Sequence, residues 1–284
     1  MKKIYFFTIL VCFSVFLNAQ TNVFNQTLKN NENSKDGQFM HSLQELSEHN
    51  LFSEGDSQEL QGSSNLKSVA ATPVAANKSD SLALVALYNA TNGPGWRHNA
   101  GWLVDSVYKW SGIRLNDEGR VIRISFWNNQ LKGNIPAEIG NLSELEYLYL
   151  ASNQLTGNIP SEIGKLTKLT RLYLHRNQLS GSIPSEIGKL SSLQSLNLND
   201  NQLSGNIPSE IGNLSNLKYL YLRDNRLSGK IPSEIGNLTN LNYLYLKSNQ
   251  LSDTIPSEFK NLLSLRSFDV SENLLTQDYP ICQV

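Results

Sequence analysis

Cysteine is nearly absent from this chain of 284 residues, which contains only Cys12 and Cys282. Cys12 lies in an apolar N-terminal run that we expect to be removed, so the mature chain cannot form an intramolecular disulfide. Charge is scarce and balanced, with 24 Lys and Arg, 25 Asp and Glu and a formal net charge of -1. This balance gives no reason to expect nucleic acid or an anionic membrane as a partner.

Residue patterns that carry catalysis or hold a cofactor are also missing. The histidines form no metal-ligand spacing with a cysteine or with each other; they are His41, His49, His98 and His175. The chain has no glycine-rich phosphate loop, no nucleophile elbow and no kinase signature. We therefore predict that the protein is not an enzyme and that it carries no cofactor and no metal ion.

What the chain has instead is a repeat of 24 residues in its C-terminal half. One column that recurs with this period is proline, at Pro136, Pro160, Pro184, Pro208, Pro232 and Pro256. Another is asparagine, at Asn129, Asn153, Asn177, Asn201, Asn225, Asn249 and Asn273. A full unit such as 145–164 fits the leucine-rich repeat pattern, whose period is about 20 to 29 residues. Such repeats stack into solenoids with an extended concave binding face.

The apolar positions of one unit predict how each coil folds. Leu145, Leu148 and Leu150 point inward from a short strand, while Tyr147 and Tyr149 alternate outward. Further apolar side chains should fill the core from the far side of the coil, namely Leu155, Ile159, Ile163 and Leu166. Proline, glutamate and glycine over 160–164 favour one short helical turn.

The predicted fold is an α/β repeat solenoid, curved and right-handed. It has one parallel β-sheet on the concave side, short helical turns or irregular coils on the convex side, and an N-terminal helical cap. The strands should begin near Arg123, Tyr147, Arg171, Ser195, Tyr219, Tyr243 and Ser267. We interpret the asparagine column as a structural ladder that satisfies backbone groups where the chain leaves each strand. Asp253, Gln277 and Tyr279-Pro280 depart from the repeat, as expected of a terminal cap.

The stretch from Leu155 to Gly164, Leu-x-Gly-x-Ile-Pro-x-Glu-Ile-Gly, resembles the plant-type subclass of leucine-rich repeats. That subclass includes receptor-kinase ectodomains and polygalacturonase-inhibiting proteins, so the resemblance implies recognition of a protein or peptide. The segment 110–113 is similar to the Trp-x-Gly-Val element of plant caps, but Tyr108 and Leu115 stand where those caps carry cysteines. The lack of these disulfides points to a bacterial origin.

Composition divides the chain into four segments. Residues 1–19 have the pattern of a secretory signal peptide with cleavage near Ala19, and residues 20–79 form a polar leader that we expect to be disordered. Residues 80–120 form the N-terminal cap, whose amphipathic helix should use Asp80 as its N-cap. Residues 121–284 form the solenoid. We therefore expect a secreted, cell-surface or periplasmic protein with no membrane insertion.

Three tryptophans in the cap, Trp96, Trp102 and Trp110, allow two interpretations. They can cover the open end of the first coil, or they can form a sugar-binding platform. Because an open solenoid end needs bulky apolar cover, we favour a place in the core.

Function is expected on the concave face, where the residues between the strand leucines point outward. The candidate ligand-binding residues are Trp127, Tyr147, Tyr149, Arg171, Tyr173, His175, Tyr219, Tyr221, Arg223, Tyr243, Tyr245 and Lys247. Tyrosines with interspersed arginines have the composition of binding hot spots, although tyrosine pairs also stabilise strands. Ser195, Asn197 and Asn199 interrupt the aromatic residues, so this face can hold two patches.

The sequence favours a secreted, non-enzymatic module that binds a protein or peptide. The alternative is a carbohydrate-binding or adhesion protein whose tyrosines and Trp127 stack on sugar rings. Ice binding is a weaker alternative, because a flat ice face needs a regular column of small residues such as threonine, and the sequence alone reveals none.

Overall fold

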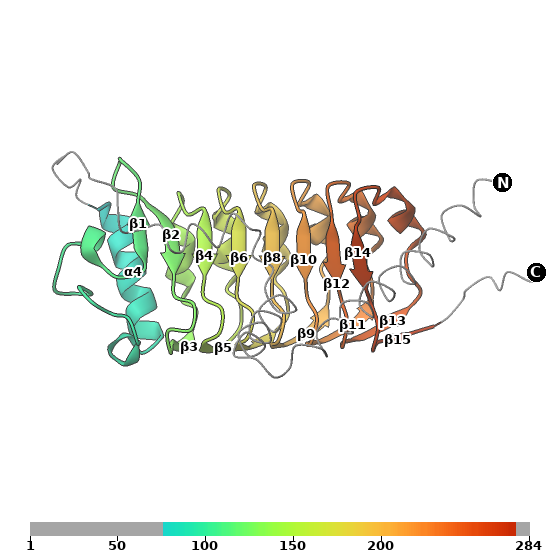
Figure 1. The fold of residues 1–284 in the computed structure, drawn as a ribbon, viewed down its shortest axis with the longest axis horizontal. Coiled ribbons are helices and arrows are strands. Elements are labelled where there is room, and N and C mark those ends of the chain that lie inside the picture. Colours follow the sequence, from blue (N-terminus) through green and yellow to red (C-terminus); the bar gives the residue numbers. More distant parts are fainter. Residues whose placement is uncertain (1–75, 277–284) are drawn as a thin grey trace, which may run out of the picture. The chain divides into compact units, whose positions relative to one another are not determined.

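A computed structural model describes residues 76–276, which belong to a compact unit spanning Thr72–Val284. Short strands and 3-10 helices alternate along this part of the chain and stack coil upon coil next to an N-terminal helix (Figure 1). The predicted signal peptide, the leader up to residue 75 and the residues from Gln277 onward lie outside the described residues. The predicted repeat solenoid is confirmed.

The first sheet has eight strands in the order β1-β2-β4-β6-β8-β10-β12-β14. Their bounds are Ile113–Leu115 (β1), Val121–Ser125 (β2), Tyr147–Tyr149 (β4), Arg171–Tyr173 (β6), Ser195–Asn197 (β8), Tyr219–Tyr221 (β10), Tyr243–Tyr245 (β12) and Ser267–Asp269 (β14). β1 is antiparallel to β2, and every later pair is parallel, with partners one repeat apart as in Leu148↔Leu172. The seven predicted parallel strands are therefore confirmed, although β2 already begins at Val121.

A second parallel sheet was not predicted. Its order is β15-β13-β11-β9-β7-β5-β3. The bounds are Lys132–Asn134 (β3), Gln154–Gly157 (β5), Gln178–Gly181 (β7), Gln202–Asn206 (β9), Arg226–Lys230 (β11), Gln250–Asp253 (β13) and Leu274–Leu275 (β15). Most of these segments contain a glycine and a single apolar residue, which is a weak strand sequence. They become strands because stacking sets the backbones of successive coils side by side, with partners 22 residues apart, as in Thr156↔Gln178.

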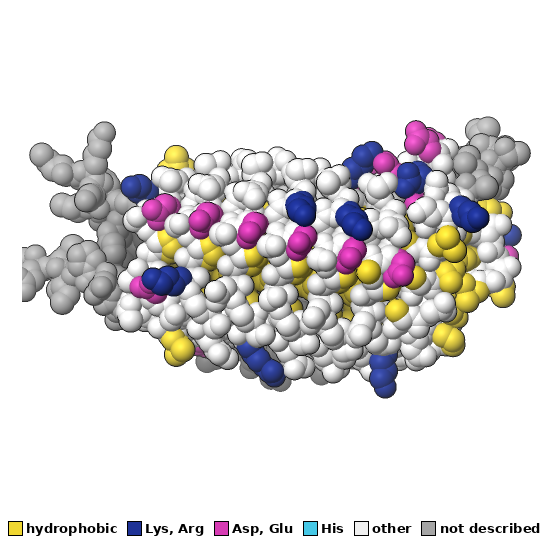
Figure 2. Space-filling model, turned by 180° about the vertical axis from the view of Figure 1, so that it is seen from behind, with side chains coloured by type: hydrophobic (Ala, Val, Ile, Leu, Met, Phe, Trp, Pro, Cys, Tyr) yellow, Lys and Arg dark blue, Asp and Glu magenta, His cyan; other side chains and the backbone are white. Residues whose placement is uncertain are grey.

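One 3-10 helix closes the back of each coil. The helices span Ala137–Asn141 (η3), Ser161–Lys165 (η4), Ser185–Lys189 (η5), Ser209–Asn213 (η6), Ser233–Asn237 (η7) and Ser257–Asn261 (η8). The predicted turn over 160–164 thus starts one position later, because Pro160 precedes the helix in an extended conformation with ψ 141. Seen from behind, acidic side chains form a regular row along the molecule (Figure 2), in agreement with the one glutamate that each helix carries.

Glycine in these helices is required by the neighbouring coil. A Cβ atom at Gly212 would lie 2.5 Å from the carbonyl oxygen of Glu234 in the next coil. That distance is too short for any side chain. The last 3-10 helix of the described residues has Lys260 at this position, and no further coil helix follows it within residues 76–276. The glycine column therefore reports close packing between coils.

The inward columns of the repeat are buried as predicted. The residues with no exposed area include Leu145, Leu148, Leu150, Leu155, Ile163 and Leu166, and Ile159 is 3% exposed. One continuous apolar core joins both sheets to the cap.

The cap begins with α4, residues Lys78–Ala90, and continues through η1 (Gly93–Gly95) and η2 (Val107–Lys109). The prediction that Asp80 caps the helix is wrong, because Asn77 is the N-cap and accepts a hydrogen bond from the Ser79 amide. Asp80 is instead fully buried and accepts hydrogen bonds from Arg120, at 3.0 Å from both Nε and Nη2, and from the Val121 amide at 2.8 Å. This ion pair fastens the helix to the first coil.

The tryptophans of the cap belong to the core. Trp96, Trp102 and Trp110 are 4%, 4% and 6% exposed, and the ring centroids of Trp102 and Trp110 are 4.4 Å apart. The Trp110 indole donates to the carbonyl of Asp105 at 2.8 Å. Buried rings cannot stack on a sugar, so the core interpretation of this cluster holds.

Candidate binding surface

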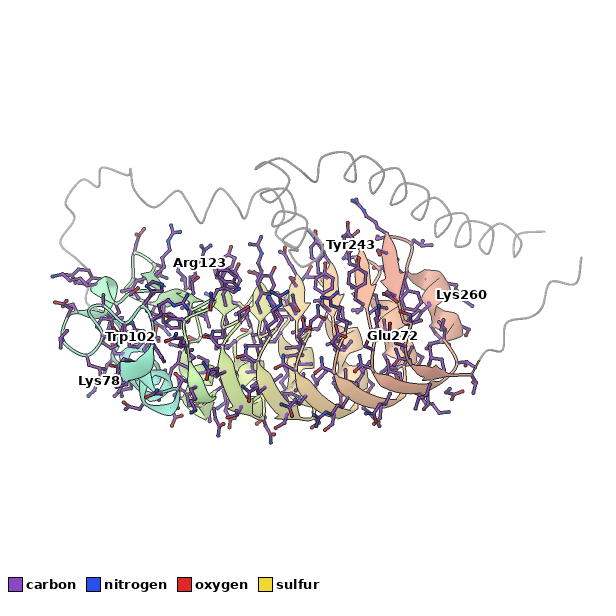
Figure 3. The ribbon with its side chains drawn as sticks, turned by 60° about the horizontal axis from the view of Figure 1, so that its bottom comes forward. Lys78, Trp102, Arg123, Tyr243, Lys260 and Glu272 are labelled. Atoms are coloured by element: carbon purple, nitrogen blue, oxygen red, sulfur yellow. The ribbon has the colours of Figure 1, made fainter. Side chains whose placement is uncertain are left out.

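The outward side chains of β2, β4, β6, β8, β10, β12 and β14 form one surface, which we call the tyrosine face. Its strand residues are Arg123, Ser125, Tyr147, Tyr149, Arg171, Tyr173, Ser195, Asn197, Tyr219, Tyr221, Tyr243, Tyr245, Ser267 and Asp269. They share a face because the residue between each pair, such as Leu148, points into the core. Arg123 and Tyr243 lie toward opposite ends of this surface (Figure 3).

The N-terminal half of the tyrosine face, on β2, β4 and β6, combines arginine with tyrosine. The Arg123 guanidinium lies 4.5 Å from the centre of the Tyr147 ring, and that of Arg171 lies 5.5 Å from it. Arg171 also donates from Nη1 to the hydroxyl of Tyr149 at 3.3 Å, and the Tyr149 and Tyr173 rings stack at 4.9 Å. Burial raises the pKa of Tyr149 to about 12, so its phenol stays neutral.

The C-terminal half, on β10, β12 and β14, is built mainly from tyrosine pairs. The Tyr219 and Tyr243 rings stack at 5.4 Å with an interplanar angle of 14°, and those of Tyr221 and Tyr245 lie 5.3 Å apart. The Tyr245 hydroxyl is 3.1 Å from the Ser267 hydroxyl. These pairs are in register on adjacent strands, which is the cross-strand packing that the sequence suggested.

The middle strand, β8, places small polar residues between these halves. Ser195, Asn197 and Asn199 are 4%, 8% and 5% exposed. The Asn199 side-chain oxygen accepts a hydrogen bond from the backbone N–H of Arg223 at 2.8 Å. The backbone N–H of Asn199 donates to the Asn197 side-chain oxygen at 3.2 Å. In register, Asn197 lies between Tyr173 and Tyr221. The middle of the face is therefore a buried polar strip.

Burial changes the chemistry of two residues of this region, Tyr221 and His175. Tyr221 is 1% exposed, so the prediction that its ring is displayed outside the core is wrong. Burial raises the pKa of Tyr221, and its buried hydroxyl has no hydrogen-bond partner among the described residues. Burial, followed by the charges of Arg176 and Arg223, lowers the pKa of His175 to about 4, so this imidazole is neutral at pH 7.

The remaining candidate residues follow the strands. Trp127 is 53% exposed after β2. Two cations of the C-terminal half lie beside carboxylates: Arg223 Nε is 3.4 Å from Asp224, and Lys247 Nζ is 3.1 Å from Glu272. The strands thus bring the predicted tyrosines together, whereas Trp127 stands at the cap end of the surface.

The asparagine column connects neighbouring coils through hydrogen bonds. The Asn201 amide nitrogen donates to the carbonyls of Leu174, at 3.1 Å, and Leu198, at 3.2 Å. Its oxygen accepts from the Leu179 amide at 3.0 Å. Equivalent bonds recur around Asn153, Asn177, Asn225, Asn249 and Asn273. Asn129 instead bonds to the backbone of His98 in the cap.

The candidate list omitted Arg123, which packs against Tyr147. The signal for it was present, because Arg123 occupies the same position of its coil as Arg171. Within residues 76–276 no helix is long and apolar enough to cross a membrane. The same residues contain no cluster of three or more His, Cys, Asp or Glu side chains suited to a metal ion.

Two family patterns match the chain. The leucine-rich repeat region pattern covers residues 127–204, and a second leucine rich repeat pattern covers residues 191–251. A probable leucine-rich repeat receptor-like protein kinase of Arabidopsis thaliana is 50% identical over 42 residues. That match covers 15% of this chain and 4% of the kinase.

The solved structures that share the fold include two plant proteins, a peptide hormone receptor and an ice-binding protein. The peptide hormone receptor RGFR1, in complex with RGF2, is 41% identical with a TM-score of 0.55, over 56% of this chain and 26% of the receptor. A plant ice-binding protein is 30% identical with a TM-score of 0.63, over 70% of this chain and 73% of that protein. The chain therefore spans only a small part of RGFR1 and of the receptor-like protein kinase.

Proposed function

Because the chain belongs to the leucine-rich repeat family, we propose that it is a secreted, non-enzymatic module whose tyrosine face binds a protein or peptide. The observation that carries this proposal is the set of paired rings on adjacent strands, above all Tyr219 with Tyr243. The likeness to a plant peptide hormone receptor supports the same class of ligand. The N-terminal pattern of a signal peptide supports secretion.

Tyrosine suits this role for a physical reason. Its ring offers a large, rigid contact area with only two rotatable bonds to the ring, and its hydroxyl can exchange hydrogen bonds at the rim of an interface. Stacking against a neighbouring ring fixes each side chain before a partner arrives. The entropy lost on binding is then small, which favours affinity.

The proposal is tested with Tyr219→Ala combined with Tyr243→Ala, since both rings are only partly buried. Peptides are first selected from a displayed library of random dodecapeptides on the full chain, and the strongest is then titrated calorimetrically. The double variant should lose about 2 kcal/mol or more of binding free energy. The matched control is Glu210→Ala with Glu234→Ala, on the exposed back of the molecule, which should keep the parent affinity. Equal affinity of both variants would remove the tyrosine face from the site.

Ice binding is a second candidate that two observations favour. One is the likeness to a plant ice-binding protein over 73% of that protein. The other is a recurring set of small hydroxyl residues on the second sheet, at Thr156, Ser180, Ser204, Ser228 and Ser252. The interpretation that the sequence holds no such set is therefore wrong, because these residues recur every 24 positions. These hydroxyls recur once per coil as an offset row, because the register pairs Thr156 with Gln178 and Ser180 with Gln202.

Thermal hysteresis measurements distinguish the two candidates. If the second sheet binds ice, the parent shows hysteresis, and Ser204→Tyr with Ser228→Tyr removes it by interrupting the row of hydroxyls. The Tyr219 and Tyr243 double variant should keep it. A parent without hysteresis rejects ice binding. Carbohydrate binding, the other alternative, gains no support from the relatives and is checked on the same protein with a glycan array.

A further inference from the structure

One residue of each coil has a left-handed backbone although it carries a side chain. These residues follow the strands of the tyrosine face and directly precede the asparagine column, and we call them the left-handed row. Their φ angles lie between 50° and 57°, at Asn128, Ser152, Arg176, Asp200, Asp224, Ser248 and Glu272. The Cβ atom crowds the following carbonyl oxygen in this conformation, and only asparagine and aspartate tolerate it well. Four members of the row are therefore strained, namely Ser152, Arg176, Ser248 and Glu272.

The backbone of the row would suit glycine better than these side chains. The second sheet also has a column with positive φ, and there the chain uses glycine, as at Gly205 with φ 74°. A Cβ atom at Gly205 would have its nearest neighbour at 3.7 Å, which is an ordinary contact. Glycine at that position is thus explained by the backbone and not by lack of space. In the left-handed row no coil within residues 76–276 has glycine, so side chains are kept there in spite of the strain.

Two of the four strained side chains take part in the fold. The Ser248 hydroxyl donates to the Glu272 carboxylate at 2.5 Å, and Lys247 Nζ lies 3.1 Å from the same carboxylate. The other two, Ser152 and Arg176, form no side-chain hydrogen bond and no ion pair among residues 76–276. The strained row thus divides into a bonded C-terminal pair and an N-terminal pair whose side chains bond to no described residue.

Ser152 and Arg176 occupy the same position of adjacent coils, at the border of the N-terminal half of the tyrosine face. The backbone N–H of Ser152 donates to the carbonyl of His175 at 2.9 Å, so the two coils run side by side here. Ser152 is half-buried and Arg176 is exposed. The charge of Arg176 helps to lower the pKa of His175 and brings the fold no attraction. No contact among the described residues therefore offsets the strain at these two positions.

We propose that Ser152 and Arg176 donate hydrogen bonds to carbonyl oxygens of the protein or peptide that covers the tyrosine face. Their side chains share one property, an O–H or N–H donor, and the main chain of a partner offers a carbonyl at every residue. Backbone strain that the fold itself does not use is typical of binding sites. This inference rests on the proposed function and extends the same site by two specificity-determining residues.

Relief of the strain provides the first test. Ser152→Gly with Arg176→Gly should leave the Tm unchanged or raise it, because glycine accepts a positive φ. The same variant should bind the strongest peptide from the dodecapeptide library about tenfold more weakly, because two donors are lost. The matched control is Ser185→Gly with Lys189→Gly on η5, which also removes one exposed hydroxyl and one exposed cation. Glycine has no advantage in that helix, so the control should lower the Tm and keep the parent affinity.

The outcomes separate this inference from the proposed function. Unchanged affinity in the Ser152 and Arg176 variant overturns the inference, and so does an equal loss of affinity in the control. A clear fall in the Tm of the same variant would assign the two side chains to the fold and overturn it as well. None of these results affects the proposed function, which depends on the Tyr219 and Tyr243 double variant. If the library yields no peptide, both fail.

Asparagine and aspartate at position 152 provide the second test. Both tolerate the left-handed backbone and have nearly the same shape, but asparagine has an N–H donor and ionised aspartate only accepts. Titrations at high salt screen the added charge. Ser152→Asn should bind the same peptide within about threefold of the parent, and Ser152→Asp should bind it about tenfold more weakly. Equal affinities of these two variants would show that the partner does not recognise a donor, and the proposal would be wrong.

Discussion

The second sheet and the 3-10 helices of the solenoid come from the same 24-residue repeat as its tyrosine face. The sequence of the first two is nearly uniform from coil to coil, and that of the tyrosine face varies. Along the second sheet the unit Gln-Leu-Ser-Gly recurs with few changes. The first outward position that the strands of the tyrosine face share in register instead holds Arg123, Tyr147, Arg171, Ser195, Tyr219, Tyr243 and Ser267. Slots that pack against a neighbouring coil repeat unchanged, and slots that face outward are free to differ. The variable surface is therefore where recognition is expected.

The largest loss of stability should come from a change in the cap, which covers the N-terminal end of the apolar core. Trp110→Ala removes a ring that is 6% exposed and should cost about 3–5 kcal/mol of unfolding free energy, because the cavity cannot refill. Denaturant unfolding measures it. Trp127→Ala is the control, and with a ring that is 53% exposed it should cost less than about 0.5 kcal/mol. Similar losses of stability at the two sites would contradict the interpretation that Trp110 covers the open end of the core.

A smaller effect tests why the back is uniform. Gly212→Ala puts a methyl group 2.5 Å from the carbonyl oxygen of Glu234, so the coils must shift and stability should fall by about 1–3 kcal/mol. Lys260→Ala changes the equivalent position of the last described coil helix and should be nearly neutral in the same assay. If both variants are equally stable, close coil packing does not explain the glycine column.

On the variable face, His175 should make stability depend on pH. Its pKa is about 4 in the folded protein against 6.5 in the unfolded chain, so the unfolded state binds the proton more readily. The free energy of unfolding that depends on a neutral His175 is fully present above pH 6.5 and is lost as the pH falls toward 4. The parent should lose about 1–2 kcal/mol more than His175→Gln over this window, in unfolding experiments at both pH values. Parallel pH profiles would show that His175 is not held neutral.

The smallest effect concerns one hydroxyl. Tyr221→Phe removes a buried group that has no hydrogen-bond partner among the described residues, so stability should stay unchanged or rise by up to about 1 kcal/mol. Tyr245→Phe removes the hydroxyl next to Ser267 and should cost about 0.5–1.5 kcal/mol. Thermal unfolding compares the two. A marked loss in Tyr221→Phe would mean that its hydroxyl is satisfied in solution.

Much of the architecture was predictable because a strict period repeats every local signal many times. The alternation of Leu148 between Tyr147 and Tyr149 sets the inward and outward sides of a strand, and stacking of identical coils then sets the order of the sheet. The same alternation indicated which side chains share the candidate binding surface. It could not indicate how deeply each one is covered, as Tyr221 demonstrates.

The sequence by itself determined the period, the inward columns, the seven parallel strands of the first sheet and the set of outward residues, because these depend only on spacing within one coil. Tertiary structure alone decided the features that depend on contacts between coils. These are the second sheet, the close approach behind Gly212, the burial of Asn197 and Tyr221, and the pairing of Asp80 with Arg120. The partners in such contacts lie about a repeat or more apart in the chain, so no local pattern encodes them, and only the packed coils bring their atoms together.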